Sequence, residues 1–96
     1  MRIVLLHQAE MEFWASVHYY ESQEPGLGVR FEHEVDQFLA RIAADPTKPR
    51  LRRDCYRRIN LSVFHHYIAY AIRENVIWVI AICHASRRPE YWLKRI

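Results

Sequence analysis

The spacing of apolar residues in the first half of the chain predicts one strand followed by two helices. Residues 2–6 (Arg-Ile-Val-Leu-Leu) are apolar except for the first, as is typical of a short strand. From Gln8 to Glu24, and again from Val29 to Ala44, apolar residues recur every three or four positions, as on one face of a helix. The intervening Pro25-Gly26-Leu27-Gly28 breaks the helical pattern, so the two helices are expected to form an antiparallel hairpin.

The second half of the chain predicts three more strands. Strand-like runs cover residues 55–61, 64–73 and 76–83. Glu74-Asn75 separates the last two and is expected to form a tight turn. The third run contains no charged or strongly polar residue, so we expect both of its faces to be covered and place it at the sheet centre. The tail is expected to form one helical turn that begins at Pro89.

These elements predict an α+β fold of order β-α-α-β-β-β, with a helical hairpin packed on a small, mainly antiparallel sheet. A chain of 96 residues is expected to form one domain, residues 1–96. The apolar run at its start is too short for a signal sequence or a membrane span, which favours a cytoplasmic location and no membrane partner. Cys55 and Cys83 have no metal or redox spacing and are expected to be buried thiols.

The net charge of +3 conceals an uneven distribution of charge along the chain. Residues 1–46 carry three basic and eight acidic side chains, a net charge of −5. Residues 47–96 carry eleven basic and three acidic side chains, a net charge of +8. This polarity suggests one surface that faces solvent and another that binds an anionic partner.

The apolar third strand is followed at once by a cluster of cationic and aromatic residues: His84, Arg87, Arg88, Tyr91 and Trp92. Arginines bind phosphates, and a histidine or a tyrosine can transfer a proton, so these residue types suit a phosphate-directed site. In the alternative interpretation the arginines are solvated, the aromatic residues cover the core and His84 bonds a backbone group. Residue types alone do not choose between the two.

A second basic set lies in the middle of the chain and comprises Arg50, Arg52, Arg53, Arg57 and Arg58. In a strand, Arg57 and Arg58 point to opposite faces, so only one of them can join a given surface. The set either forms a phosphate-binding groove with the C-terminal cluster or marks an edge strand whose charges discourage pairing with other chains.

Several familiar kinds of catalytic site are not indicated. His65 and His66 alternate across a strand and cannot bind one metal ion, and His66 is expected to be a core histidine with satisfied hydrogen bonds. Two glycines cannot build a phosphate-binding loop, and no serine lies in a catalytic motif. Any catalysis is therefore expected to need no metal or other cofactor. The aromatic residues of the first helix are expected in the core: Phe13, Trp14, Tyr19 and Tyr20.

Two ordered sets of residues resemble the RelE/ParE toxin superfamily, from about residue 9 to residue 95. The first set comprises Ala9, Glu12-Phe13, Ala15, Tyr19-Tyr20-Glu21, Pro25-Gly26-Leu27-Gly28, Arg30-Phe31, Glu34-Val35 and Asp45-Pro46. The second comprises Arg57-Arg58, Phe64, Ile68, Tyr70, His84, Arg87, Pro89, Tyr91-Trp92 and Arg95. Each motif alone is weak, and their ordered combination carries the resemblance.

The resemblance implies a toxin of a type II toxin–antitoxin (plasmid stabilisation) module, held in a complex by a small cognate antitoxin. Such antitoxins wrap an extended or helical segment around the toxin, and the basic second half suits an acidic, partly disordered partner. The residues implied in binding a target or the antitoxin are Arg57, Arg58, Arg87, Arg88 and Trp92.

The superfamily contains two mechanisms, and both are open at this point. ParE-like members poison DNA gyrase without chemistry of their own, and the Pro-Gly-Leu-Gly break with its long hairpin resembles these members more. RelE-like members cleave mRNA on the ribosome without a metal ion, and His84, Arg87 and Tyr91 would then be catalytic. The second predicted strand lacks the lysines common in ribonuclease members, and His65-His66 stands where relatives have Pro-Tyr. Gyrase binding is therefore the first hypothesis and mRNA cleavage the alternative.

Overall fold

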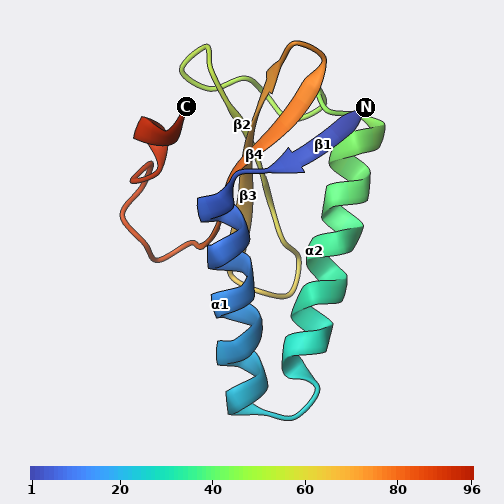
Figure 1. Ribbon diagram of the computed structural model, residues 1–96, viewed down its shortest axis with the longest axis vertical. Helices are drawn as coiled ribbons and strands as arrows, with labels where there is room; N and C mark the ends of the chain where they lie inside the picture. The colour runs from blue at the N-terminus through green and yellow to red at the C-terminus, as the bar shows by residue number, and fades with distance from the viewer.

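The computed structural model describes all residues from 1 to 96 and has the predicted α+β fold (Figure 1). The elements follow the order β1 (Arg2–Leu5), α1 (His7–Gln23), α2 (Leu27–Ala44), β2 (Arg57–Asn60), β3 (His66–Arg73) and β4 (Val76–His84). β2 is shorter than the predicted run 55–61, because Cys55 belongs to the turn of residues 53–55 and Tyr56 forms only an isolated bridge with Arg52. The helical turn of the tail covers Leu93–Arg95 and does not begin at Pro89, so that prediction is wrong.

The four strands form one sheet in the order β1-β4-β3-β2. β3 is antiparallel to both β2 and β4, whereas β1 runs parallel to β4. β4 therefore lies inside the sheet, as its uninterrupted apolar sequence predicts. The turn between β3 and β4 has Glu74 at φ 53° and Asn75 at φ 62°, the paired left-handed conformation of a tight hairpin turn.

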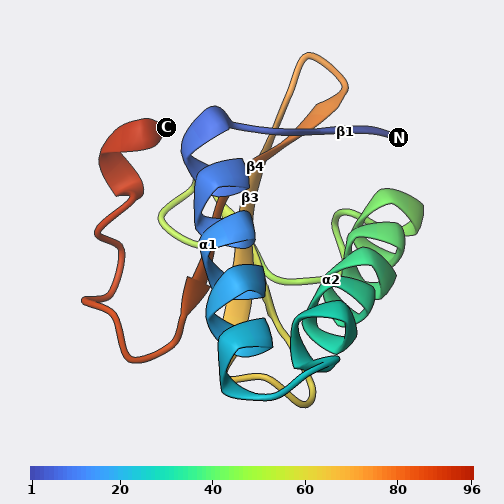
Figure 2. The same cartoon turned by 60° about the horizontal axis from the view of Figure 1, so that its bottom comes forward.

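Both helices pack on the same face of the sheet and form an antiparallel hairpin (Figure 2). Phe13 of α1 and Phe31, Phe38 and Ile42 of α2 meet Ile68 and its neighbours of the sheet in a continuous buried core. Gly28 lets the helices approach closely, since a Cβ atom there would lie 2.5 Å from the carbonyl oxygen of Val17. The side chain of Glu21 accepts hydrogen bonds from the backbone N–H groups of Gly26 and Gly28, at the start of α2.

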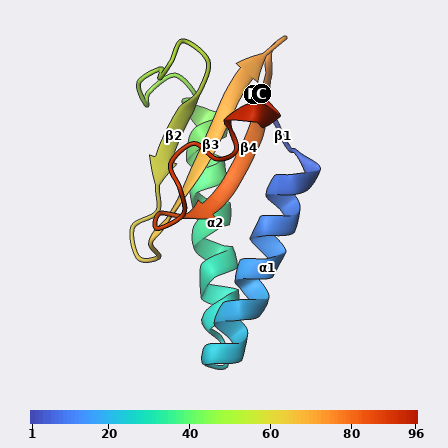
Figure 3. The ribbon, with the colours of Figure 1, turned by 90° about the vertical axis from the view of Figure 1, so that its left-hand side faces the viewer.

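The opposite face of the sheet, here called the outer face, is covered in part by the C-terminal segment Pro89–Ile96 (Figure 3). Trp92 is the centre of this packing, because it is fully buried against Tyr56 and Tyr67. The salt bridge between Arg53 and Glu90 and the 2.5 Å hydrogen bond from the Tyr56 hydroxyl to Glu90 attach the segment to the turn before β2. The chain thus has two apolar layers, one on each face of the sheet.

Two predictions about buried side chains are only partly correct. On α1, Phe13 is buried and Tyr20 is half-buried, whereas Trp14 and Tyr19 are 43% and 59% exposed. Both cysteines are free thiols, but only Cys83 is buried. None of the helices combines the length and apolar character required to cross a bilayer.

Candidate functional site

β4 extends beyond the end of β1. β1 ends opposite Val79, but β4 continues to His84, so the backbone groups on that side of its last residues have no neighbouring strand. Side chains take the place of the strand. The N–H of Ile82 donates to Glu12 Oε1 at 3.3 Å, and Arg95 Nη1 donates to the carbonyl oxygen of Ile80 at 3.1 Å. We call this arrangement the β4 edge cluster.

Tyr91 belongs to the β4 edge cluster and is not a free hydroxyl. Its OH donates a short hydrogen bond to Glu12, which also accepts two bonds of 3.1 Å from the guanidinium of Arg95. The side chains of Glu12 and Arg95 are each only 15% exposed. Burial first, and then the bond to Glu12, raise the pKa of Tyr91 well above its usual value. Tyr91 therefore stays protonated and holds the C-terminal segment against α1.

The outer face carries two arginines stacked on tyrosine rings. The guanidinium carbon of Arg58 lies 3.7 Å from the ring centre of Tyr67, and that of Arg87 lies 4.1 Å from the ring centre of Tyr91. The Tyr67 hydroxyl accepts a 2.8 Å hydrogen bond from Trp92 Nε1, and burial is the main cause that raises the pKa of Tyr67 to about 12. Both tyrosines are thus fixed and neutral platforms for cations.

His84 lies apart from the stacked arginines, on the helix side of the sheet. Its ring packs against that of His66 with the ring centres 5.1 Å apart. The Nδ1 atom of His84 accepts a 3.0 Å hydrogen bond from the N–H of Ser86, which leaves the proton of the neutral ring on Nε2. His84 therefore offers a donor to solvent rather than a base close to Tyr91.

His66 is the satisfied core histidine that the sequence predicts. It is 5% exposed, and its two ring nitrogens lie 3.3 Å from the Ser16 hydroxyl and 3.4 Å from the Tyr20 hydroxyl. Burial first, and then the charges of His84 and His65, lower its pKa to about 4. His66 is accordingly neutral near pH 7.

The predicted binding residues do not form one surface. Arg58 and Arg87 both contact the outer face, and Arg88 is exposed in the loop after β4. Arg57 points to the helix side, where its Nη1 donates to the carbonyl oxygens of Thr47 at 3.2 Å and Pro49 at 2.7 Å. Trp92 is fully buried, so its expected role in contacting a partner does not fit this structure.

The sequence reasoning gave no role to Glu12, Tyr67 or Arg95. Glu12 and Arg95 are named there only as motif positions, and Tyr67 is not named at all. A signal for Glu12 was present, because it adjoins the buried stripe of α1 and a half-buried carboxylate requires partners. Its partners lie seventy to eighty-three residues away, so spacing could not identify them.

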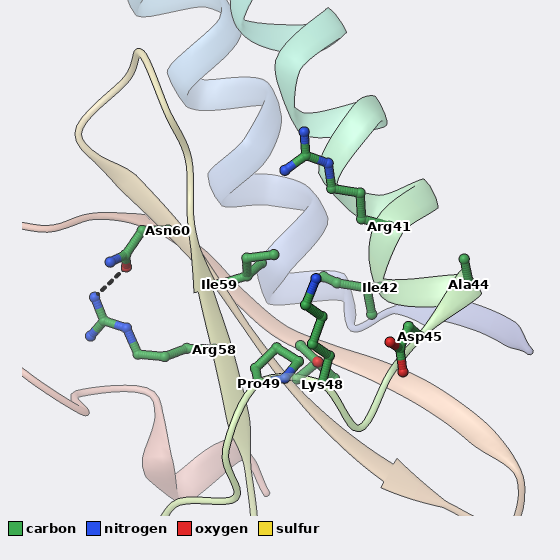
Figure 4. Close-up of a pocket in the computed structure, with 10 residues that line it drawn as sticks. Arg41, Ile42, Ala44, Asp45, Lys48, Pro49, Arg58, Ile59 and Asn60 are labelled. Carbon is green, nitrogen blue, oxygen red and sulfur yellow. Dashed lines mark hydrogen bonds between the residues drawn. The ribbon is translucent and has the colours of Figure 1, made fainter.

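The largest cavity is an open pocket of about 630 Å³ between β2, the end of α2 and the loop that follows it (Figure 4). Ile42 and Ile59 contribute apolar walls, and Arg41, Lys48 and Arg58 contribute cations. Asp45 is the single acidic residue of its lining. The pocket is therefore partly apolar and predominantly cationic.

No group of three or more histidine, cysteine, aspartate or glutamate side chains is placed to hold a metal ion. No protein-family model matches the chain, and a search of curated proteins finds no similar sequence.

Proposed function

We propose that this chain is the toxin of a type II toxin–antitoxin module, that it inhibits growth by binding DNA gyrase, and that an acidic antitoxin neutralises it. The observation that carries the choice of binding over catalysis is the placement of Tyr91 and His84. The Tyr91 hydroxyl is bound by Glu12, and His84 lies on the opposite side of the sheet from Arg58 and Arg87. Arginines are available on the outer face, but no proton-transferring pair accompanies them.

The distribution of charge supports a binding function directed at anionic groups. Most acidic side chains lie on the α1–α2 hairpin, whereas ten of the fourteen basic ones lie between Lys48 and Arg58 or between Arg87 and Arg95. Three of the hairpin carboxylates have internal roles, because Glu12, Glu21 and Glu34 each accept hydrogen bonds from backbone N–H groups of other segments. Arg53, Arg57 and Arg95 also bind groups within the chain. Lys48, Arg50 and Arg88 are exposed and can meet a partner protein.

The gyrase proposal is tested with purified protein in a supercoiling reaction. We expect inhibition and an accumulation of cleaved DNA complexes, with at least tenfold weaker inhibition for the Arg58→Ala and Arg87→Ala double variant, because each arginine loses a charge-assisted contact. Arg30→Ala, an exposed arginine on α2, is the matched control and should act like the parent. Full supercoiling at a stoichiometric excess of the parent protein would refute the proposal.

A ribosome-dependent mRNA endonuclease is the second candidate, and one observation favours it. Arg58 and Arg87 stack on the same outer face, where two cations can hold a phosphate and stabilise its developing charge. In a reconstituted translation reaction this candidate predicts transcript cleavage that Arg87→Ala abolishes. Intact transcripts with the parent protein eliminate it, and the same preparation can be used for the gyrase reaction.

Tyr91→Phe separates the catalytic role of Tyr91 from its structural role. If the hydroxyl transfers a proton, cleavage falls by about 100-fold or more. If the hydroxyl only holds Glu12, any cleavage persists while the free energy of unfolding falls by about 1–2 kcal/mol, since one charge-assisted hydrogen bond is lost.

A further inference from the structure

The outer edge of β2 has unpaired backbone groups. The N–H of Leu61 donates to the carbonyl oxygen of His66 at 3.0 Å, and this bond fixes the alternation along the β2–β3 ladder. The backbone N–H and C=O groups of Arg57 and Ile59 therefore face β3, whereas those of Arg58 and Asn60 point away from it. No backbone hydrogen bond outside the ladders involves Arg58 or Asn60. β2 is therefore an open edge.

The arginines of β2 do not protect this edge. Charged side chains commonly blunt an edge strand by extending over it. Here Arg57 turns to the helix side and binds the carbonyl oxygens of Thr47 and Pro49. Arg58 folds back over the Tyr67 ring and donates to Asn60 Oδ1 at 2.8 Å. Both side chains are held by contacts within the chain, so the edge beside Arg58 and Asn60 is accessible.

The cationic pocket adjoins this open edge. Figure 4 shows Ile59 directed to the side of β2 on which Ile42 and Arg41 of α2 lie, with Lys48 at one end. Arg58 and Asn60 project from the opposite face of the strand, and both also line the pocket. A strand added along β2 would direct alternate side chains to these two sides. One set would meet apolar walls with cations at the rim, and the other set would meet Arg58.

We infer that β2 accepts an extended, acidic segment of a partner protein as a fifth strand of the sheet. Backbone hydrogen bonds to Arg58 and Asn60 would supply affinity, and the pocket would select a segment in which apolar and acidic residues alternate. Charge complementarity identifies the occupant as acidic, because three of the four charged residues lining the pocket are basic. The identity of this partner as the antitoxin rests on the proposed function.

The test uses the full chain, labelled with ¹⁵N, and a capped octapeptide in which valine and glutamate alternate. We expect the peptide to bind with a dissociation constant below about 1 mM, the range of a short segment with few contacts. The amide signals of Arg58 and Asn60 should shift, and their hydrogen exchange should slow by at least tenfold. A valine–lysine octapeptide is the matched control and should bind at least tenfold more weakly.

Two pairs of variants separate strand addition from simple charge attraction. Asn60→Pro removes the outward N–H and should weaken binding about tenfold, whereas Asn60→Ala keeps that N–H and should bind like the parent. The Arg41→Ala and Lys48→Ala double variant should also weaken binding about tenfold, whereas Arg30→Ala, an exposed arginine of α2 outside the pocket, should not. Spectra of each free variant establish that it is folded.

Three outcomes overturn the inference: no binding at millimolar peptide, signal shifts confined to the α1–α2 hairpin or the outer face, and an unchanged affinity for Asn60→Pro. The last of these would mean that a carboxylate binds the pocket without a strand. None of these outcomes depends on gyrase, so a negative result here and a negative supercoiling assay refute different statements.

Discussion

Besides the outer edge of β1, the sheet has two places where a strand lacks a neighbour, and these two differ. Along the last residues of β4, Glu12 and Arg95 bond the backbone of Ile82 and Ile80, as a fifth strand would. Along β2, the outward groups of Arg58 and Asn60 have no such partner. Both exposed edges carry the same kinds of backbone groups, and only one is closed by side chains.

The difference indicates which edge serves stability and which is available for binding. The groups that close the β4 edge come from α1 and from the C-terminal segment, so they also attach these elements to the sheet. Removing any of them exposes a half-buried charge or an unpaired N–H. β2 lies between solvent and a cationic pocket, and the outward backbone N–H and C=O groups of the strand can bond water in the absence of a partner. The β4 edge is therefore part of the folded structure, and the β2 edge is the candidate interface.

The largest effect is expected from opening the β4 edge with Glu12→Ala. The substitution removes the acceptor of the Ile82 N–H and the Tyr91 hydroxyl, and it leaves the guanidinium of Arg95 half-buried without its carboxylate. Removal of one partner from such a network costs about 3–4 kcal/mol of unfolding free energy. Urea unfolding followed by circular dichroism measures the loss.

Glu12→Gln is the matched control, because the amide keeps an acceptor oxygen and loses only the charge. We expect it to cost about half as much as the alanine variant. A loss below about 1 kcal/mol for Glu12→Ala would mean that water replaces the carboxylate, and the contrast between the two edges would then disappear.

The second effect concerns pH and acts through His66, which lies between the two edges. Its carbonyl oxygen accepts a hydrogen bond from the N–H of Leu61, the residue after β2, and its ring packs against His84 at the end of β4. Its pKa is about 4 in the folded chain and about 6.5 when unfolded, so the unfolded chain binds the proton first. The contribution of the neutral His66 ring to the free energy of unfolding is therefore fully present above about pH 6.5, and it decreases as the pH falls from there to about 4.

The loss over this interval amounts to about 2–3 kcal/mol, since each unit of pKa difference corresponds to about 1.4 kcal/mol. Unfolding free energies measured at several pH values between 7 and 4 provide the profile. His84 and His65 are exposed, and the Tyr20 hydroxyl is the other titratable group that faces the ring. His66→Gln retains hydrogen-bonding capacity without titration and should flatten the profile; an equally steep profile in that variant would assign the effect to other groups.

Most of the fold follows from periodicity in the sequence. The stripes of α1 and α2 have helical spacing, and β4 is apolar throughout, so the types of these elements and the interior position of β4 could be predicted. The predicted run for β2 begins two residues too early and ends one residue too late, because the chain before β2 turns at Arg53 and Asp54 with positive φ and has no glycine there to indicate the turn. Local propensity does not indicate such positions when tertiary contacts hold them.

The candidate site was less predictable than the fold. The alternation rule correctly separates Arg57 from Arg58 and places His66 in the core. The alternation rule could not show that the Tyr91 hydroxyl is hydrogen-bonded to Glu12 or that Trp92 is buried, because both contacts depend on how the C-terminal segment crosses the outer face. The C-terminal segment contains only one short helical turn, so its apolar residues have no repeating spacing from which its contacts could be predicted.

A smaller effect should distinguish the two neighbouring arginines of β2. Arg57 donates to two backbone carbonyl oxygens and orders the loop before the strand, so Arg57→Ala should cost about 1–2 kcal/mol of unfolding free energy. Arg58→Ala loses a stacking contact at the surface and should cost less than about 1 kcal/mol. Hydrogen exchange in residues 47–51 should accelerate only in the Arg57 variant; equal acceleration in both would contradict the assignment of the two faces.

The smallest effect is expected for Asn60→Pro in the free protein. Proline in a strand is costly when it removes a ladder hydrogen bond, but the N–H of Asn60 points away from β3. The unfolding free energy should therefore change by less than about 1 kcal/mol relative to Asn60→Ala, although the same variant should weaken peptide binding about tenfold. A loss above about 2 kcal/mol would place this N–H in the ladder, and β2 would then be closed at the point where the inference requires it to be open.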